Sequence, residues 1–256
     1  MRISGEWDPG KVTETQCANG HECLTAAWES GYDVFDHADI YGGGFCETLY
    51  GDWLKEHPEA RKAKVVTKAG IRFDDPHRWD FSKDWIVKSC ESSLKRLGVE
   101  VIDVYLLHRP DYLMDPGEVG EAFDVLHRQG KAKYFGVSNF VPSKVTALQK
   151  HLGHKLISNQ IELSLKHLEP LADGTMDQCL ELDLVAMVWS PLAGGKYQGD
   201  PVSALRWLLK HPAKVVPVVG TAQPKRVRAL SHAPDVEMSR EDWYALLKEA
   251  QGHGLP

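Results

Sequence analysis

No apolar run of about 18 residues occurs in the sequence, and the opening residues MRISGEWDPG contain no apolar segment. A membrane-spanning helix requires a long apolar run, and a secretory leader requires an apolar segment near the start of the chain. We therefore expect neither a membrane span nor a signal peptide. The five cysteines are scattered and form no CxxC pair. This usage is typical of free thiols in a reducing compartment, and we therefore expect a cytoplasmic protein.

Strong positive charge is also missing, because the formal net charge is -6 and no basic tract interrupts the chain. This balance argues against nucleic acid as a partner. None of the 12 histidines forms an HxH pair, which a metal-dependent hydrolase would place at a strand end, so we predict no metal site. No GxGxxG motif opens a predicted helix, which argues against a dinucleotide-binding doubly wound sheet.

Short apolar runs alternate with longer amphipathic segments along the whole chain. The runs predict strands over 33–38, 64–69, 101–108, 133–138, 155–161, 184–190 and 214–219. The longer segments predict helices over 17–30, 45–57, 82–97, 116–129, 142–152, 174–182, 201–211, 223–232 and 239–250. Strand ends recur about every 30 residues, which is the size of a βαβ unit.

This regular α/β alternation, without a break in composition, predicts one domain over residues 1–256 and a (β/α)8 TIM barrel. Closure of that barrel needs eight strands, whereas the pattern predicts seven. The missing strand would have to precede residue 17, where there is no room for a full one. An open doubly wound sheet is the alternative.

Ionisable side chains follow the apolar runs at the predicted strand ends. Asp36, Lys68 and His108 each lie two residues after an apolar residue of the same strand, and Tyr41 follows shortly after Asp36. Because strand residues alternate between two faces, the three strand-end groups can point into one barrel mouth. A phenol has a pKa near ~10 and is a weak acid at neutral pH, but a neighbouring ammonium stabilises its phenolate. The set therefore predicts a proton-donating site.

Seven motifs follow one another along nearly the whole chain. They are DxAxxYG at 36–42, TK at 67–68, LLHRPD at 106–111, GVSNF at 136–140, NQIE at 159–162, WSPLAGG at 189–195 and PVVGTAQPKRV at 217–227. In this order they resemble the aldo-keto reductase superfamily, in its bacterial oxidoreductase branch. The resemblance implies a (β/α)8 barrel that transfers hydride between NADPH and a small-molecule carbonyl compound.

The resemblance also implies roles for the four ionisable residues. Tyr41 would be the general acid, and Lys68 would lower its pKa. Asp36 would pair with Lys68, and His108 would orient the carbonyl group.

Further motif positions would bind the cofactor NADP(H). Ser138, Asn139 and Gln160 would hold the nicotinamide carboxamide, and Trp189 would stack on the nicotinamide ring. The other cofactor-binding positions implied are Ser190, Leu192, Gly194, Gly220, Thr221 and Arg226. Arg226 lies in a basic group at the start of the predicted helix 223–232, where free amides already favour anions. We expect it to meet the 2′-phosphate of NADPH, although a solvated helix face explains its neighbours Lys225 and Arg228 equally well.

The sequence departs from the family pattern at three places. Residues 1–3 resemble the end of the turn that normally follows the first strand, so that strand is expected to be absent. The segment between Gly195 and Ser203 is shorter than usual, which removes part of the helix after the seventh strand of the barrel. Leu230 replaces an Asn that lies near the adenine in many relatives.

These departures leave two alternatives to an enzyme. One is a non-catalytic NADP(H)-binding regulatory protein on the same barrel, similar to potassium-channel β-subunits, and the other is an inactive remnant. We expect a monomer or a small homo-oligomer. The physiological substrate is not predicted, because such pockets are built from variable loops.

Overall fold

The computed structural model describes residues 3, 5–6 and 8–254. Its main sheet has seven parallel strands in the order β1-β2-β5-β6-β7-β8-β9. They are β1 (Val34–Asp36), β2 (Lys64–Ala69), β5 (Ile102–Leu107), β6 (Ala132–Ser138), β7 (Leu156–Glu162), β8 (Val185–Trp189) and β9 (Val215–Pro217). Each predicted strand is confirmed to within a few residues, and the sheet follows chain order, as in a barrel.

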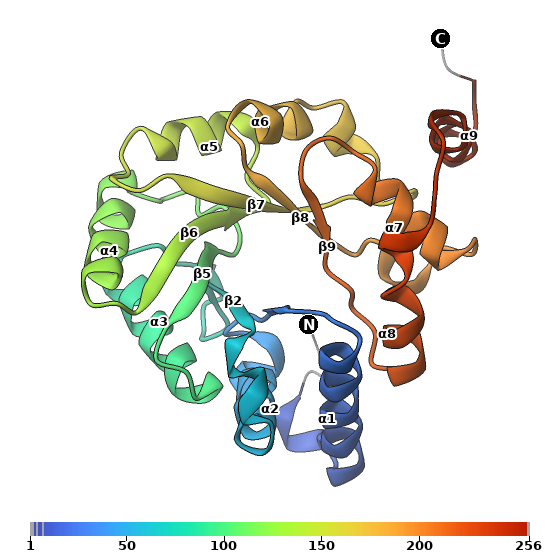
Figure 1. Cartoon of the computed structure of the whole chain (residues 1–256). Coiled ribbons are helices and arrows are strands. Elements are labelled where there is room, and N and C mark those ends of the chain that lie inside the picture. The colour runs from blue at the N-terminus through green and yellow to red at the C-terminus, as the bar shows by residue number, and fades with distance from the viewer. Residues whose placement is uncertain (1–2, 4, 7, 255–256) are drawn as a thin grey trace.

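Helices cover the outer side of the curled sheet (Figure 1). They are α1 (Glu14–Glu29), α2 (Phe45–Glu56), α3 (Lys83–Leu97), α4 (Pro116–Arg128), α5 (Pro142–Gln149), α6 (Thr175–Glu181), α7 (Pro201–Leu209) and α8 (Pro224–Leu230). A last helix, α9 (Arg240–Gln251), lies further out and packs against α7 through the stacked rings of Trp207 and Trp243. Short 3-10 helices are η1 (Pro9–Lys11), η2 (Tyr41–Gly44), η3 (Pro58–Lys62), η4 (Glu169–Leu171), η5 (Ala193–Gly195) and η6 (Ala233–Asp235). The alternation of parallel strands and outer helices is that of a partial (β/α)8 barrel.

The sheet has two edges, β1 and β9, which are not paired with each other among the residues that the structure describes. An apolar cavity lies between them, lined by Val34 and Phe35 on one side and by Val216 and Pro217 on the other. No described residue forms an eighth strand of the sheet. Of the predicted turn remnant, residues 1 and 2 lie outside the described part, and Ile3 is buried in the wall of this cavity.

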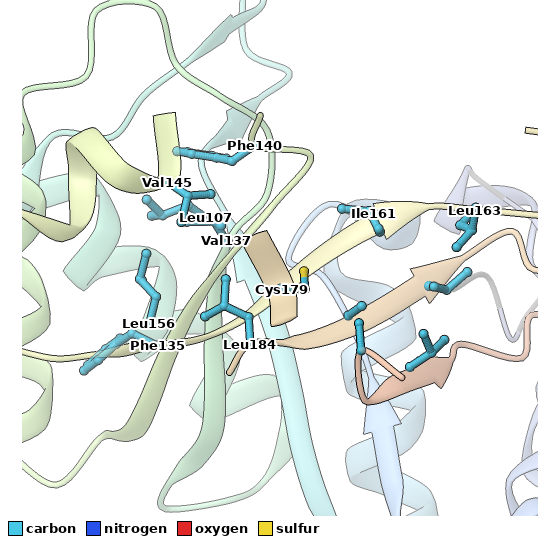
Figure 2. Close-up of a cluster of buried hydrophobic side chains, with 14 of the residues drawn as sticks. Leu107, Phe135, Val137, Phe140, Val145, Leu156, Ile161, Leu163, Cys179 and Leu184 are labelled. Atoms are coloured by element: carbon cyan, nitrogen blue, oxygen red, sulfur yellow. The ribbon is translucent and has the colours of Figure 1, made fainter. Parts of the chain in front are cut away.

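The core has an outer and an inner layer because strand residues alternate. Tyr105 and Leu107 of β5 join the large cluster between the sheet and the helices, part of which Figure 2 shows. Leu106, between them, instead packs with Val66 and Met187 in a small cluster. This alternation is what the sequence pattern predicts, and it places the residues two positions further on, at the strand ends, on the same inner side.

A two-stranded antiparallel sheet, β3 (Ile71–Arg72) and β4 (Arg78–Trp79), was not predicted from the sequence. Strands of two residues are too short to show a period of two. The hairpin follows β2 directly and carries Trp79 to a position beside Tyr112, with ring centroids 5.7 Å apart. It therefore adds exposed aromatic surface on the loop that follows Lys68.

Candidate active site

Lys68 and Asp36 form a buried ion pair at the ends of the neighbouring strands β2 and β1. The Lys68 Nζ atom lies 2.8 Å and 2.7 Å from the two carboxylate oxygens of Asp36 and donates a third hydrogen bond of 2.6 Å to the carbonyl oxygen of His37. The Lys68 side chain is fully buried and that of Asp36 is 8% exposed. Because an unpaired buried charge is strongly destabilising, these three acceptors explain how an ammonium persists at this depth.

The two charges hold each other ionised. Burial alone would raise the pKa of Asp36, but the Lys68 ammonium and a hydrogen bond from Gln160 keep that pKa below its ordinary value. Burial alone would lower the pKa of Lys68, but the Asp36 carboxylate raises it above its ordinary value. The pair therefore remains a carboxylate and an ammonium throughout the neutral pH range.

Tyr41 is placed over this pair by a turn of three glycines. Gly42, Gly43 and Gly44 have φ values of 56°, 59° and 92°, a left-handed conformation that side chains disfavour. The Lys68 Nζ atom lies 5.3 Å from the centroid of the Tyr41 ring. Burial raises the pKa of Tyr41 above 10.0, and the charge and hydrogen bond of Lys68 partly oppose that increase. The phenol therefore keeps its proton at neutral pH.

His108 completes the group at the end of β5. Its ring meets the Tyr41 ring edge-on, with centroids 5.9 Å apart at an angle of 84°. Burial, with a contribution from the Lys68 charge, holds the pKa of His108 well below 6.5. A neutral imidazole carries one N–H, and the buried Nδ1 atom has no hydrogen-bond partner among the described residues. The four predicted residues thus lie together, with a neutral acid and a neutral imidazole above a buried ion pair.

The predicted nicotinamide residues are joined to this group by a chain of hydrogen bonds. Trp189 Nε1 donates to Asn139 Oδ1 (2.9 Å), and Asn139 Nδ2 donates to Ser138 Oγ (2.8 Å). Ser138 Oγ donates to the backbone carbonyl oxygen of Gln160 (3.0 Å). The Gln160 side chain in turn donates from Nε2 to the Asp36 carboxylate (2.8 Å). The chain runs across the ends of β6, β7, β8 and β1, so these four residues and the ion pair hold one another in place.

The other predicted cofactor residues lie in the loops after β8 and β9. Ser190 and Gly194 have positive φ values of 50° and 63°, and Leu192 packs against the large core cluster. Gly220 is exposed, whereas Thr221 reaches the wall of the cavity between the sheet edges.

The basic residues of α8 differ in their surroundings. Arg228 pairs with Glu29 at 2.8 Å, whereas exposed Arg226 has no carboxylate partner in the described part of the chain. A cation of this kind fits a phosphate, and the half-buried ring of Trp189 beside amide side chains fits a nicotinamide. Leu230, which replaces the Asn of many relatives, is buried in the core.

A buried network around Thr67, the residue before Lys68, was not predicted from the sequence. The fully buried Glu47 accepts hydrogen bonds from Thr67 Oγ1 (2.6 Å) and Arg96 Nε (2.7 Å). Burial and the Glu47 charge raise the pKa of Asp39 to about 8. Thr67 precedes Lys68, so this network fixes the strand that carries the ammonium. The sequence signal for this network was an acidic residue, Glu47, among mostly apolar neighbours in a predicted helix.

In the described part of the chain, no helix has the length and apolar character needed to cross a membrane.

Comparison with known proteins finds one family along most of the chain. The sequence pattern of the "Aldo/keto reductase family" matches residues 1–203. The chain is 39% identical to "Uncharacterized oxidoreductase YcsN" of Bacillus subtilis (strain 168), over 99% of this chain and 95% of that protein. It is 36% identical to a "6-dehydroglucose reductase" of Novosphingobium aromaticivorans, over 93% and 88% of the two chains.

The alignment with YcsN extends over 288 residues, more than the 256 of this chain, so that relative carries residues that this chain lacks. Among solved structures, an aldo-keto reductase from Klebsiella pneumoniae in complex with NADP and acetate has a TM-score of 0.82 and 23% identity, covering 95% of this chain and 89% of that one. At this identity the structural likeness shows the fold.

Proposed function

The chain belongs to the aldo/keto reductase family, and we propose that it reduces the carbonyl group of a small aldehyde or ketone with NADPH. The observation that carries this proposal is the buried Lys68–Asp36 pair beneath the Tyr41 phenol and the neutral His108 ring. The name of the Novosphingobium relative and the NADP complex of the Klebsiella structure support the reaction and the cofactor.

Tyr41 is the proton donor in this proposal. When bound, NADPH supplies the hydride that adds to the carbonyl carbon, and negative charge develops on the carbonyl oxygen. The Tyr41 hydroxyl gives its proton to that oxygen, and the Lys68 ammonium stabilises the phenolate that remains. The neutral His108 ring donates an N–H hydrogen bond to the same oxygen, which orients the substrate. Asp36 keeps Lys68 charged and in place.

The proposed cofactor site extends from the ion pair to α8. Trp189 would stack on the nicotinamide ring, and Ser138, Asn139 and Gln160 would hold its carboxamide. The loop with Ser190, Leu192 and Gly194 and the loop with Gly220 and Thr221 flank the phosphates. Arg226 binds the 2′-phosphate, so NADPH is preferred over NADH.

The test is to mix the protein with NADPH and a panel of reactive aldehydes and to follow the loss of cofactor absorbance. We expect turnover that falls by about 100-fold or more in Tyr41→Phe, since general-acid catalysis contributes about that much. Tyr134→Phe is the matched control, because Tyr134 is an exposed tyrosine on β6.

Each of the other outcomes rejects either the proposed function or the proposed role of Tyr41. NADPH fluorescence that changes without turnover would identify a cofactor-binding regulator. The absence of any cofactor effect would identify an inactive remnant. Wild-type turnover that survives in Tyr41→Phe would remove Tyr41 from the mechanism.

A further inference from the structure

A pocket of about 370 Å³ opens beside the four-residue site, which is large enough for a small ligand. We call it the rim pocket; it is lined by Trp79, Arg109, Pro110, Tyr112, Asn139, Val141 and Lys144. It adjoins the reaction site at two points. Arg109 directly follows His108, and Asn139 Nδ2 donates a 3.3 Å hydrogen bond to the His108 carbonyl oxygen. A substrate whose carbonyl group reached Tyr41 and His108 would therefore extend into this pocket.

Two aromatic rings form one wall of the rim pocket. Trp79 from the β3–β4 hairpin and Tyr112 from the loop after β5 meet edge-on, and the side chains are 44% and 79% exposed. The Lys144 Nζ atom lies 4.4 Å from the centroid of the Tyr112 ring. This contact holds the ammonium in the pocket wall, since a cation is attracted to an aromatic face.

The charges of the rim pocket are positive and lack a carboxylate partner, although Arg109 lies over the Trp189 ring, 5.3 Å from its centroid. No acidic residue lines it, and neither Arg109 nor Lys144 forms an ion pair with any residue that the structure describes. The neighbouring Asp111 is engaged elsewhere, because its carboxylate accepts hydrogen bonds from the backbone N–H groups of Phe81 and Leu113. Two unpaired cations on a protein with a net charge of -6 indicate a place for a negative ligand.

The hairpin beside the pocket shows the contrasting case. Arg72 pairs there with Asp80 at 2.8 Å, and Arg78 pairs with Asp74 at 3.2 Å. The two arginines of the hairpin are thus neutralised by aspartates of the fold, whereas Arg109 and Lys144 of the rim pocket have no such partner among the described residues. The N-terminal end of α5 also lies at the pocket, because its N-cap residue, Val141, is part of the lining. Val141 makes no side-chain capping bond, and the helix dipole at this end favours an anion.

We propose that the rim pocket binds an oxyanion group of the substrate, so that the protein prefers aldehydes or ketones that carry a carboxylate or phosphate. The inference rests on the proposed function, because the carbonyl group must lie at Tyr41 while the anion lies between Arg109 and Lys144. The rings of Trp79 and Tyr112 pack against the part of the substrate that joins the two groups.

Matched pairs of substrates test this selectivity. We compare 4-carboxybenzaldehyde with 4-formylbenzamide, and glyceraldehyde 3-phosphate with glyceraldehyde, and measure kcat/KM for each with the wild type and with Lys144→Gln. We expect the wild type to favour the charged member of at least one pair, and the pair that responds identifies the anion. In Lys144→Gln that preference falls about fivefold, the effect of one partly screened charge, while the neutral member is unaffected.

The matched control is Lys150→Gln, because Lys150 is an exposed lysine at the end of the same helix and does not line the pocket. It should retain the wild-type preference. Equal use of charged and neutral members by the wild type would overturn the proposal. A preference that Lys144→Gln leaves unchanged would overturn it as well.

A binding measurement separates this proposal from failure of the proposed function. The product 4-carboxybenzyl alcohol is titrated calorimetrically into the wild type and Lys144→Gln in the presence of NADPH, with 4-(hydroxymethyl)benzamide as the neutral analogue. Tighter binding of the charged alcohol, reduced about fivefold by the substitution, supports the anion site even if no aldehyde is turned over. Equal binding of the two alcohols to the wild type would refute it.

Discussion

Removal of the Lys68 charge should destabilise the protein strongly, and the loss should depend on pH. Lys68→Met keeps most of the length of the side chain but leaves the Asp36 carboxylate buried without a cation. Among the residues that the structure describes, the donor that remains to this carboxylate is the Gln160 amide, at 2.8 Å. Leaving one partner of a buried ion pair unpaired costs about 3–5 kcal/mol, so the free energy of unfolding at neutral pH should fall by about that amount.

The pH dependence follows from the pKa of Asp36. In the wild type that pKa is held below its ordinary value, so its contribution to stability is present above the unfolded pKa of about 3.9 and is lost as the pH falls. In Lys68→Met burial outweighs the remaining Gln160 hydrogen bond and raises the pKa of Asp36 above its unfolded value. Protonation of Asp36 then stabilises the folded variant. The difference between its free energy of unfolding and that of the wild type should therefore shrink as the pH falls from about 7 to 4. Lys68 itself, with a raised pKa, stabilises the protein at all pH values below about 10.4 and so does not affect this window.

Urea unfolding followed by circular dichroism measures these free energies. The double variant Asp36→Asn, Lys68→Met removes both charges and should recover most of the loss, to within about 1 kcal/mol of the wild type. Lys55→Met is the matched control, because Lys55 makes an exposed ion pair of 2.7 Å with Asp52, and it should cost less than about 1 kcal/mol. A deficit of Lys68→Met that is the same at acidic and neutral pH would refute the reasoning, as would a double variant no more stable than the single one.

Three further predictions concern the cofactor, the backbone and the histidine. Arg226→Ala should raise the KM for NADPH about tenfold or more and leave that for NADH unchanged, and an equal effect on both cofactors in steady-state kinetics would contradict the assignment. Gly70→Ala should destabilise the protein by several kcal/mol in urea unfolding, because its φ is +111° and an added Cβ would overlap the Phe81 ring. The control Gly130→Ala, with φ +67° and open space around it, should cost about 1 kcal/mol. Equal losses in the two variants would exclude the steric explanation. Since burial holds the pKa of His108 well below 6.5, the reduction rate at saturating NADPH should stay flat between about pH 6 and 8, and a protonation step in that range that disappears in His108→Gln would contradict a neutral ring.

The arrangement of strands could be predicted because each strand is a short apolar run that ends at a polar residue or a turn. The two-residue strands of the β3–β4 hairpin show no such pattern and were missed. Alternation along the strands placed Lys68 and His108 on the same side correctly, since the side-chain period of two is a local property of the backbone.

Electrostatics and long-range contacts were less accessible from the sequence. The resemblance implied that Lys68 lowers the pKa of Tyr41. In the structure the charge and hydrogen bond of Lys68 do act in that direction, but burial is the larger effect and raises the pKa above 10.0. Burial depends on the whole fold, so its size is not readable from neighbouring residues. The chain of hydrogen bonds from Trp189 to Asp36 likewise joins residues on separate strands, and only the folded sheet brings them together.

The most direct test of the central claim is a single turnover of excess protein with NADPH and an aldehyde, followed in a stopped-flow instrument for the wild type and Tyr41→Phe. NADPH fluorescence first establishes that both proteins bind the cofactor equally. We predict that the wild type then oxidises its bound NADPH and forms an equal amount of alcohol, while Tyr41→Phe does so about 100-fold more slowly or worse. Equal single-turnover rates in the two proteins would contradict the account.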